Sequence, residues 1–289
     1  MQHADPPVVY GESHIQPRGD YASANPDYTC EQNWQAYTPA EHDRYRRLLA
    51  RQLQHVHGRA CPEFVEALPH IAIDTGIPRF ERVNEPLGKA TGWQVVAVPG
   101  LIPEREFFTL LATRRFPVTR WLRNEDEFDY VVEPDLFHDL FGHVPMLFDP
   151  VFAGYMQAFG QGGLKAEGLH ALELLSRLYW YTVEFGLVDT AEGLRIYGAG
   201  ILSSVGEVDH CLTSPEPWRI VFDAQRAMRT RYKIDTYQET YFVIRSFDAL
   251  FKATNVDFTP LYDTLRDLPS LAAGEHAPGD VQVPVASSA

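Results

Sequence analysis

Hydrophobic and polar positions follow the period of an α-helix along most of this chain. Apolar residues recur three and four positions apart, which predicts a helix starting at Pro103 and further helices over residues 38–58, 148–160, 167–187, 217–232 and 246–254. The helix predicted over residues 38–58 opens with Thr38-Pro39-Ala40-Glu41, which combines an N-cap, a proline in the first turn and a capping-box glutamate. Short apolar runs predict strands at Trp93–Val98, Phe116–Leu122, Arg195–Tyr197 and Tyr241–Ile244. We therefore expect a mainly α fold with a small β component, in the α+β class.

The two ends of the chain lack this periodicity. Residues 1–30 are rich in Pro, Gly, His and Asp, and residues 272–289 in Ala, Gly, Pro and Ser, which predicts a flexible N-terminal arm and a flexible C-terminal tail. No linker, repeat or charge block interrupts residues 31–271. We expect a single catalytic domain over that range, since a chain of 289 residues can bury one large core.

Composition and charge narrow the function classes. A formal net charge of −14 argues against non-specific nucleic-acid binding and against an anionic membrane surface, both of which need an excess of Lys and Arg. The three cysteines are widely spaced and suit free thiols in a reducing compartment. No secretory signal and no apolar run of membrane-spanning length is found. We expect a cytoplasmic protein.

The segment Pro134–Pro145 (PDLFHDLFGHVP) concentrates two imidazoles and two carboxylates in apolar surroundings. Neutral imidazole is the commonest protein ligand for transition metals, so His138 and His143 are candidate ligands. On a regular helix residues five apart are separated by roughly 140°, which excludes the HExxH arrangement of zinc proteases. Gly142 and Pro145 suggest that the helix ends here, which would let His143 turn toward His138. The alternative is two unrelated histidines.

Glu184 supplies a third candidate ligand. It lies at the end of an apolar stripe formed by Leu174, Leu178 and Tyr181, where a buried carboxylate is costly unless it meets a cation. An ion pair with an arginine is the alternative. Two histidines and one carboxylate form the facial triad of non-haem Fe(II) oxygenases, but zinc could use the same residues for hydrolysis. The ligand set alone does not separate these chemistries.

Five blocks of the sequence resemble the pterin-dependent aromatic amino acid hydroxylases, especially the bacterial members. They lie at Val95–Pro103, Arg114–Pro117, Pro134–Pro145, Leu178–Leu187 and Ile196–Ser204, and the resemblance covers about residues 60–260. It implies one catalytic domain of that family's type, with Fe(II) bound by His138, His143 and Glu184, a tetrahydrobiopterin or related tetrahydropterin as cofactor, and O₂ as co-substrate. No side chain beyond the iron site is expected to be catalytic.

The resemblance also assigns the organic ligands. The pterin is expected at Gly100, Leu101, Phe107, Asp139 and Tyr179, with Phe107 stacked on its ring and Asp139 reaching it through water. The amino acid is expected at Arg123, Pro134, Trp180, Phe185, Gly200 and Ser203, with Arg123 binding the substrate carboxylate and Ser203 hydrogen-bonding an iron-ligating histidine. From the residues alone, Phe107 also fits a core position, and Arg123 fits a surface ion pair beside Glu125, Asp126 and Glu127.

Within the family, Trp180 and Ile234 favour L-phenylalanine, converted to L-tyrosine, and the bacterial branch implies an unregulated monomer. A hydroxylase of the same family acting on tryptophan, a zinc-dependent hydrolase using the same triad and a binding protein that has lost catalysis are the alternatives. Activity without O₂ and pterin would identify the hydrolase.

Overall fold

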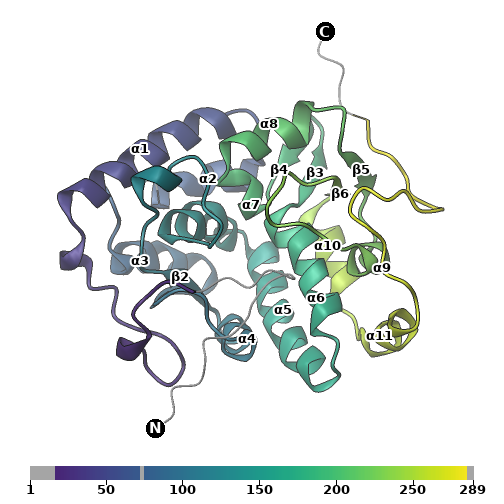
Figure 1. The fold of residues 1–289 in the computed structure, drawn as a ribbon, viewed down its shortest axis with the longest axis horizontal. Helices are drawn as coiled ribbons and strands as arrows, with labels where there is room; N and C mark the ends of the chain where they lie inside the picture. Colours follow the sequence, from purple (N-terminus) through teal and green to yellow (C-terminus); the bar gives the residue numbers. More distant parts are fainter. Residues whose placement is uncertain (1–16, 72–74, 285–289) are drawn as a thin grey trace.

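Helices make up most of the fold, and two small sheets flank them. The computed structural model describes residues 17–71 and 75–284. The described helices are α1 (Pro39–Val56), α2 (Pro62–Ile71), α3 (Phe80–Thr91), α4 (Glu104–Ala112), α5 (Pro150–Gly168), α6 (Leu172–Tyr179), α7 (Ala199–Leu202), α8 (Val205–Thr213), α9 (Ala224–Arg229), α10 (Phe247–Thr254) and α11 (Thr259–Arg266) (Figure 1). The strands are β1 (Gln94–Val98), β2 (Arg115–Thr119), β3 (Leu187–Thr190), β4 (Gly193–Ile196), β5 (Trp218–Val221) and β6 (Thr240–Ile244). The predicted mainly α fold with a small β component is confirmed.

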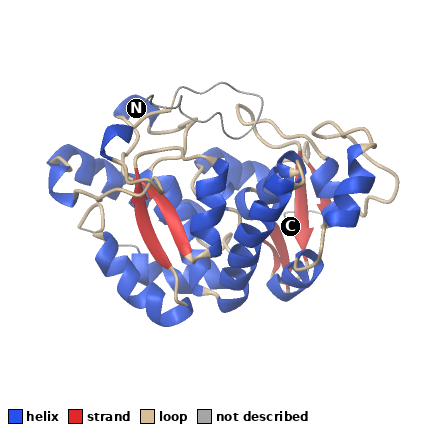
Figure 2. Ribbon diagram, turned by 90° about the horizontal axis from the view of Figure 1, so that it is seen from below, coloured by secondary structure: helices blue, strands red, loops and turns tan. Residues whose placement is uncertain are grey.

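The two sheets lie toward opposite ends of the molecule, with helices between them (Figure 2). Strands β1 and β2 are parallel and are joined through α4. The second sheet has the order β4-β3-β6-β5, in which β3 and β4 form an antiparallel hairpin and the other pairs are parallel. A continuous apolar core connects the two halves. None of the described helices is both long and apolar enough to span a bilayer.

Several predicted elements are confirmed close to their expected bounds. Helix α1 begins with the complete capping box, in which the Thr38 side chain accepts from the Glu41 amide at 3.2 Å and the Glu41 carboxylate accepts from the Thr38 amide at 2.8 Å. The prediction of one helix over residues 217–232 was wrong. The apolar run Trp218–Val221 pairs with the buried strand β6 instead, and Asp223 then caps the short helix α9.

The sequence predicts two flexible chain ends, and the structure describes part of each of them. The part of the arm that the structure describes, residues 17–30, packs on the domain: the Tyr21 hydroxyl donates to the Leu101 carbonyl at 2.8 Å, and Cys30 forms a β-bridge with Ala97. Residues 1–16 and 285–289 lie outside the described residues. All three cysteines are unpaired, as expected.

The described tail, residues 272–284, is also held against the domain. Asp280 forms a buried ion pair with Arg226 at 2.9 Å, and His276 stacks on Trp218 with ring centroids 3.8 Å apart. The Val283 amide donates to the carbonyl of Arg219 in β5 at 2.8 Å. The described residues of the tail therefore pack against the edge of β5 and around the buried Asp280 carboxylate, and the flexibility that their composition suggests stays a prediction.

We expect Asp280→Ala to release this tail. The substitution leaves the Arg226 guanidinium buried without its counter-charge, which should lower the free energy of unfolding by about 3 kcal/mol. Limited proteolysis should then cleave the chain near residue 280 much faster than in the wild type. Burial alone would raise the pKa of Asp280, but hydrogen bonds from Arg226 and the Ala277 amide lower it, so the wild-type contact persists at neutral pH and weakens in acid.

The control is Asp263→Ala, which removes an exposed partner of Arg266 and should change stability by less than about 0.5 kcal/mol. Equal cleavage rates for the Asp280 variant and the wild type would contradict the proposed anchor.

Candidate metal centre and adjoining pocket

The two candidate histidines lie on a π-helical turn, η4 (His138–His143). A π-helix closes its hydrogen bonds between residues five apart, so His138 and His143 fall one turn above each other on the same face. The opposite face anchors the turn in the core, where Phe137 and Phe141 stack on each other and pack edge-on against Tyr45 and Phe64 respectively. The sequence analysis expected the helix to end so that His143 could turn, which was wrong: a wider winding brings the two imidazoles together.

Glu184 also lies on a π-helical turn, η6 (Trp180–Glu184), which continues α6. The Phe185 amide donates to the Trp180 carbonyl, five residues back, at 2.9 Å. The predicted regular helix over residues 167–187 is therefore interrupted before it reaches the ligand. The winding places Glu184 one turn beyond Tyr179, and both side chains line the same pocket.

His138, His143 and Glu184 converge on one point. The two Nε2 atoms of the histidines are 3.1 Å apart. A carboxylate oxygen of Glu184 lies 3.2 Å from Nε2 of His143, and the other lies 3.6 Å from Nε2 of His138. Adjacent ligands of an octahedral ion with bonds of about 2.1 Å are separated by about 3.0 Å. The three donors therefore fit one face of such an ion and leave the opposite face for other ligands. The alternatives of unrelated histidines and of an arginine partner for Glu184 are not found.

A serine fixes the tautomer of His138. The Ser203 hydroxyl donates its hydrogen to the Ala199 carbonyl at 2.8 Å, so it must accept from His138 Nδ1, which lies 2.8 Å away. The proton on Nδ1 leaves the Nε2 lone pair directed at the metal position. Gly142 permits this contact, because a Cβ there would lie 2.8 Å from the Ala199 carbonyl oxygen and would push α7 away.

The electrostatics of the centre suit a cation. Burial lowers the pKa of His138 to about 4, so this imidazole is neutral and able to coordinate. Burial would raise the pKa of Glu184, but the nearby His143 outweighs it and keeps the carboxylate ionised. Burial raises the pKa of the neighbouring Asp139 to about 7, although its Oδ2 accepts a hydrogen bond from the Thr119 amide at 2.7 Å.

We expect Ser203→Ala to weaken metal binding about 10- to 100-fold, because His138 loses the acceptor that holds its tautomer and orientation. Titration of the metal-free protein with Fe(II) or Co(II) under anaerobic conditions would measure the affinity. Ser204→Ala is a matched control, since that hydroxyl caps α8 rather than a ligand. An unchanged affinity in the Ser203 variant would contradict the assigned hydrogen bond.

The metal centre opens into a cavity of about 640 Å³. Its volume is within the range of sites for small organic ligands. Besides the three metal ligands, the lining includes every residue for which the sequence analysis predicted a binding role: Gly100, Leu101, Phe107, Arg123, Pro134, Asp139, Tyr179, Trp180, Phe185, Gly200 and Ser203. These residues come from segments far apart in the sequence and meet only in the folded chain. Phe107 and Tyr179 lie edge to face, with ring centroids 5.8 Å apart.

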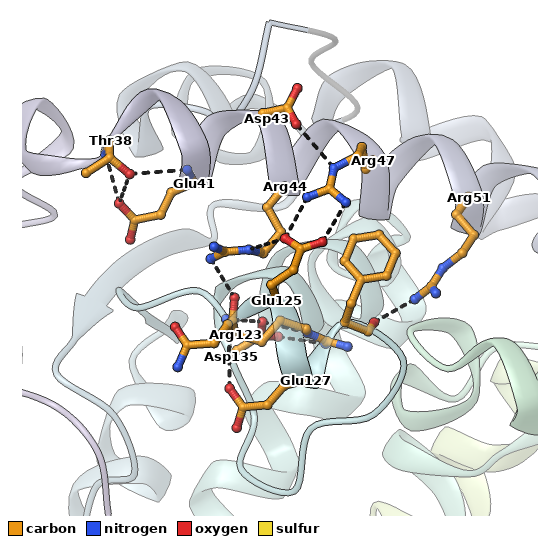
Figure 3. Close-up of polar contacts among 12 residues, drawn as sticks. Thr38, Glu41, Asp43, Arg44, Arg47, Arg51, Arg123, Glu125, Glu127 and Asp135 are labelled. Carbon is orange, nitrogen blue, oxygen red and sulfur yellow. Dashed lines mark hydrogen bonds and ion pairs between the residues drawn. The ribbon is translucent and has the colours of Figure 1, made fainter.

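Arg123 is buried in the pocket wall and is paired with a residue that the sequence analysis did not assign. Asp135 accepts from Arg123 Nε at 2.8 Å and from Nη2 at 2.9 Å (Figure 3), and its Oδ1 also accepts from the His138 amide at 2.9 Å. The alternative of a surface ion pair is therefore not found. Asp135 uses one edge of the guanidinium and leaves Nη1, with the second hydrogen of Nη2, for another carboxylate. Asp135 therefore also connects Arg123 to the metal ligand His138.

A row of arginines on α1 holds the segment that follows Arg123. Arg44 donates to the Arg123 carbonyl at 2.9 Å, and Arg47 forms two hydrogen bonds of 2.7 Å with Glu125 (Figure 3). Arg51 donates to the Phe128 carbonyl at 2.7 Å and lies over the Phe128 ring. The spacing of three and four residues places the three arginines on one face of α1. Both ends of the held segment, at Arg123 and at Asp129–Tyr130, line the pocket.

The sequence analysis missed several residues that shape the pocket. Asp135, the first carboxylate of the Pro134–Pro145 segment, supports the lining residue Arg123 and could have been noticed there. Tyr130 and the loop Ile234–Gln238 line the pocket and are joined by a hydrogen bond of 2.7 Å from the Tyr130 hydroxyl to the Ile234 carbonyl. Of this loop the sequence analysis considered Ile234 alone, because no local pattern identifies a loop that reaches a site only through tertiary contacts.

Known proteins share both the sequence and the fold. A family model described as biopterin-dependent aromatic amino acid hydroxylase matches residues 4–259. The chain is 57% identical over 262 residues to the phenylalanine-4-hydroxylase of Ralstonia nicotianae, which covers 90% of this chain and 84% of that protein. The phenylalanine-4-hydroxylase of Caulobacter vibrioides is 53% identical, and the match covers 91% of this chain and 90% of that protein. The fold is similar to an iron- and phenylalanine-bound crystal structure of phenylalanine hydroxylase from Chromobacterium violaceum, with a TM-score of 0.87. The two chains are 52% identical, and the match covers 90% of this chain and 96% of that chain.

Proposed function

The chain belongs to the family of biopterin-dependent aromatic amino acid hydroxylases, and from this premise we propose how its residues divide the work of the site. Its activity is the hydroxylation of L-phenylalanine to L-tyrosine with O₂ and a tetrahydropterin at a non-haem iron held by two histidines and a carboxylate. The single observation that supports this activity best is the facial arrangement of His138, His143 and Glu184 at the base of a cavity large enough for both organic ligands.

Iron and the tetrahydropterin, when bound, supply O₂ activation and the two electrons that the reaction requires. The donor set fits Fe(II), because neutral imidazoles and one carboxylate leave three of six positions open. The protein contributes positioning and exclusion of water, and no side chain has to act as a nucleophile. This division of roles agrees with ligands that are largely buried and line a cavity shared with Phe107, Tyr179 and Trp180.

The pterin is proposed to lie along Gly100, Leu101 and Phe107, with Tyr179 between it and the metal. A flat heterocycle is well matched by the face of an aromatic ring. Phe107 is partly buried and sits at the edge of the core, so its ring can support a ligand without leaving its packing. Asp139 borders the same part of the cavity.

The amino acid is proposed to bind with its carboxylate on the free edge of Arg123. Its ring would lie against Pro134, Trp180, Phe185 and Gly200, which belong to the apolar lining. Gly200 is required there, since a Cβ would lie 2.7 Å from the Phe185 ring. Ser203 contributes by holding His138 rather than by gripping the substrate directly.

We further propose that the protein is a cytoplasmic monomer whose catalytic domain extends over residues 31–271. The three free cysteines support a reducing compartment. Sedimentation equilibrium at several concentrations would measure the oligomeric state, and a mass of twice 32.8 kDa would contradict a monomer.

The test of the activity is an assay of tyrosine produced from phenylalanine, in which Fe(II), tetrahydropterin and O₂ are each omitted in turn. We expect no product in any of the three omissions. Turnover of an ester or amide by the zinc-loaded protein without O₂ would support the hydrolase instead, and binding of the ligands without any product would support a protein that has lost catalysis. Parallel assays with tryptophan would measure the ring preference.

A further inference from the structure

Gln238 is buried where the substrate side of the pocket meets the loop Ile234–Gln238. Its Oε1 accepts a hydrogen bond of 2.8 Å from the indole Nε1 of Trp180, and its Nε2 donates to the Lys233 carbonyl at 2.8 Å. Only 3% of the residue is exposed. The orientation of the amide is chemically determined, because an indole nitrogen can only donate and a carbonyl can only accept. Gln238 therefore offers Trp180 a fixed acceptor.

The backbone of Gln238 is anchored to α8. Its amide donates to Glu207 at 3.1 Å, and its carbonyl lies 3.2 Å from His210 Nε2. Glu207 is itself buried and accepts a second hydrogen bond from the Tyr241 hydroxyl. The acceptor for Trp180 is thus supported by α8 and by strand β6 as well as by its own loop.

Stacking alone does not fix how the Trp180 ring lies within its own plane. The indole lies against Tyr232, with centroids 4.2 Å apart and planes 12° apart, and against Phe185 at 4.6 Å and 34°. Such contacts fix the plane of a ring, but they allow it to slide or rotate within that plane. The directional N–H bond to Gln238 removes that freedom, so it determines which edge of the indole borders the pocket.

We propose that Gln238 is the positioning residue that orients Trp180 against the aromatic ring of the substrate, and that this orientation sets how often oxygen reaches the ring. The proposal rests on the proposed function, in which Trp180 borders the substrate ring. Gln238 also links Trp180 to the loop that carries Ile234, whose carbonyl accepts from Tyr130 on the other side of the pocket. One side chain therefore sets the relative positions of two walls of the amino-acid site.

The first test is Gln238→Leu, which preserves the approximate size of the side chain and removes the acceptor. We expect the KM for phenylalanine to rise about fivefold to tenfold, as for loss of one buried hydrogen bond. The yield of tyrosine per tetrahydropterin oxidised should fall, while iron content and the KM for the pterin stay unchanged. Gln157→Leu is the matched control, because Gln157 makes similar amide hydrogen bonds to Ala112 and Arg114 and does not line the pocket.

The second test asks whether Gln238 acts through the indole. Trp180→Phe retains a stacking ring and lacks the N–H, so we expect it to lower the tyrosine yield by itself, and Gln238→Leu should then lower it little further. The single Trp180 variant keeps the proposal testable if the leucine variant fails to fold. An unchanged yield in either single variant, or full additivity in the double variant, would overturn the proposal. Absence of tyrosine from the wild type would instead overturn the proposed function.

Discussion

Glu184→Ala is expected to abolish tight iron binding and tyrosine formation together. The carboxylate is the one anionic ligand of the triad, and its side chain lies 3.2 Å from His143 and 3.6 Å from His138. Its loss leaves two neutral imidazoles to hold a dication in a buried site. A buried charge partner is worth several kcal/mol, which corresponds to a factor on the order of 10³ or more in affinity.

Anaerobic Fe(II) titration and the tyrosine assay would measure the two effects on one preparation. Glu85→Ala is the matched control, since Glu85 is exposed on α3, pairs with the exposed Lys89 and does not line the pocket. The control should bind iron and turn over as the wild type does. Full pterin-dependent turnover by the Glu184 variant would disprove the ligand assignment.

The second large effect is expected from Asp135→Ala. This carboxylate is completely buried and compensates the charge of Arg123, so its removal should lower the free energy of unfolding by about 3–5 kcal/mol. It should also raise the KM for phenylalanine by about 100-fold, because the guanidinium loses the partner that directs its free edge into the pocket. Urea unfolding and steady-state kinetics would measure the two changes.

Asp135→Asn keeps an oxygen acceptor but removes the charge. We expect its free energy of unfolding and its KM for phenylalanine to lie between those of the alanine variant and the wild type. It also provides a soluble variant if the alanine variant does not fold. The KM for the pterin should change much less than that for phenylalanine in both variants. Wild-type stability and an unchanged phenylalanine KM in both would show that the buried pair has no role in the site.

The sequence predicted the parts of the fold whose signals are local. Helix α1 carries its own cap, and the strand β1 contains four consecutive apolar residues, Val95–Val98, so both were located to within a few residues. Helices α2 and α3 were missed, and each contains an internal proline, Pro69 and Pro86, which a local analysis counts against a helix. Strand β5 was assigned to a helix because its strand character depends on pairing with β6, about twenty residues further along the chain.

In the site, too, the features with a local sequence signal were predicted and those that depend on distant contacts were not. The residue types of the three metal ligands were evident from two short segments, and the family resemblance assigned the pocket residues that the fold then brings together. The winding of η4 and η6 was not foreseen, since π-helical turns are rare and the residue period that predicts a helix does not distinguish them from an α-helix. Asp135 and Gln238 were missed because their partners, Arg123 and Trp180, lie 12 and 58 residues away.

The two π-helical turns also affect how this chain tolerates changes in length. A π-turn holds one residue more than an α-turn between its hydrogen-bonded groups, so η4 corresponds to a single-residue insertion in an ordinary helix. Deleting one residue between His138 and His143 would let the segment relax to an α-helix with the imidazoles four apart, the spacing of helical zinc sites. The convergence of His138 and His143 at a spacing of five residues therefore depends on the π-helical winding as much as on the identity of the ligands.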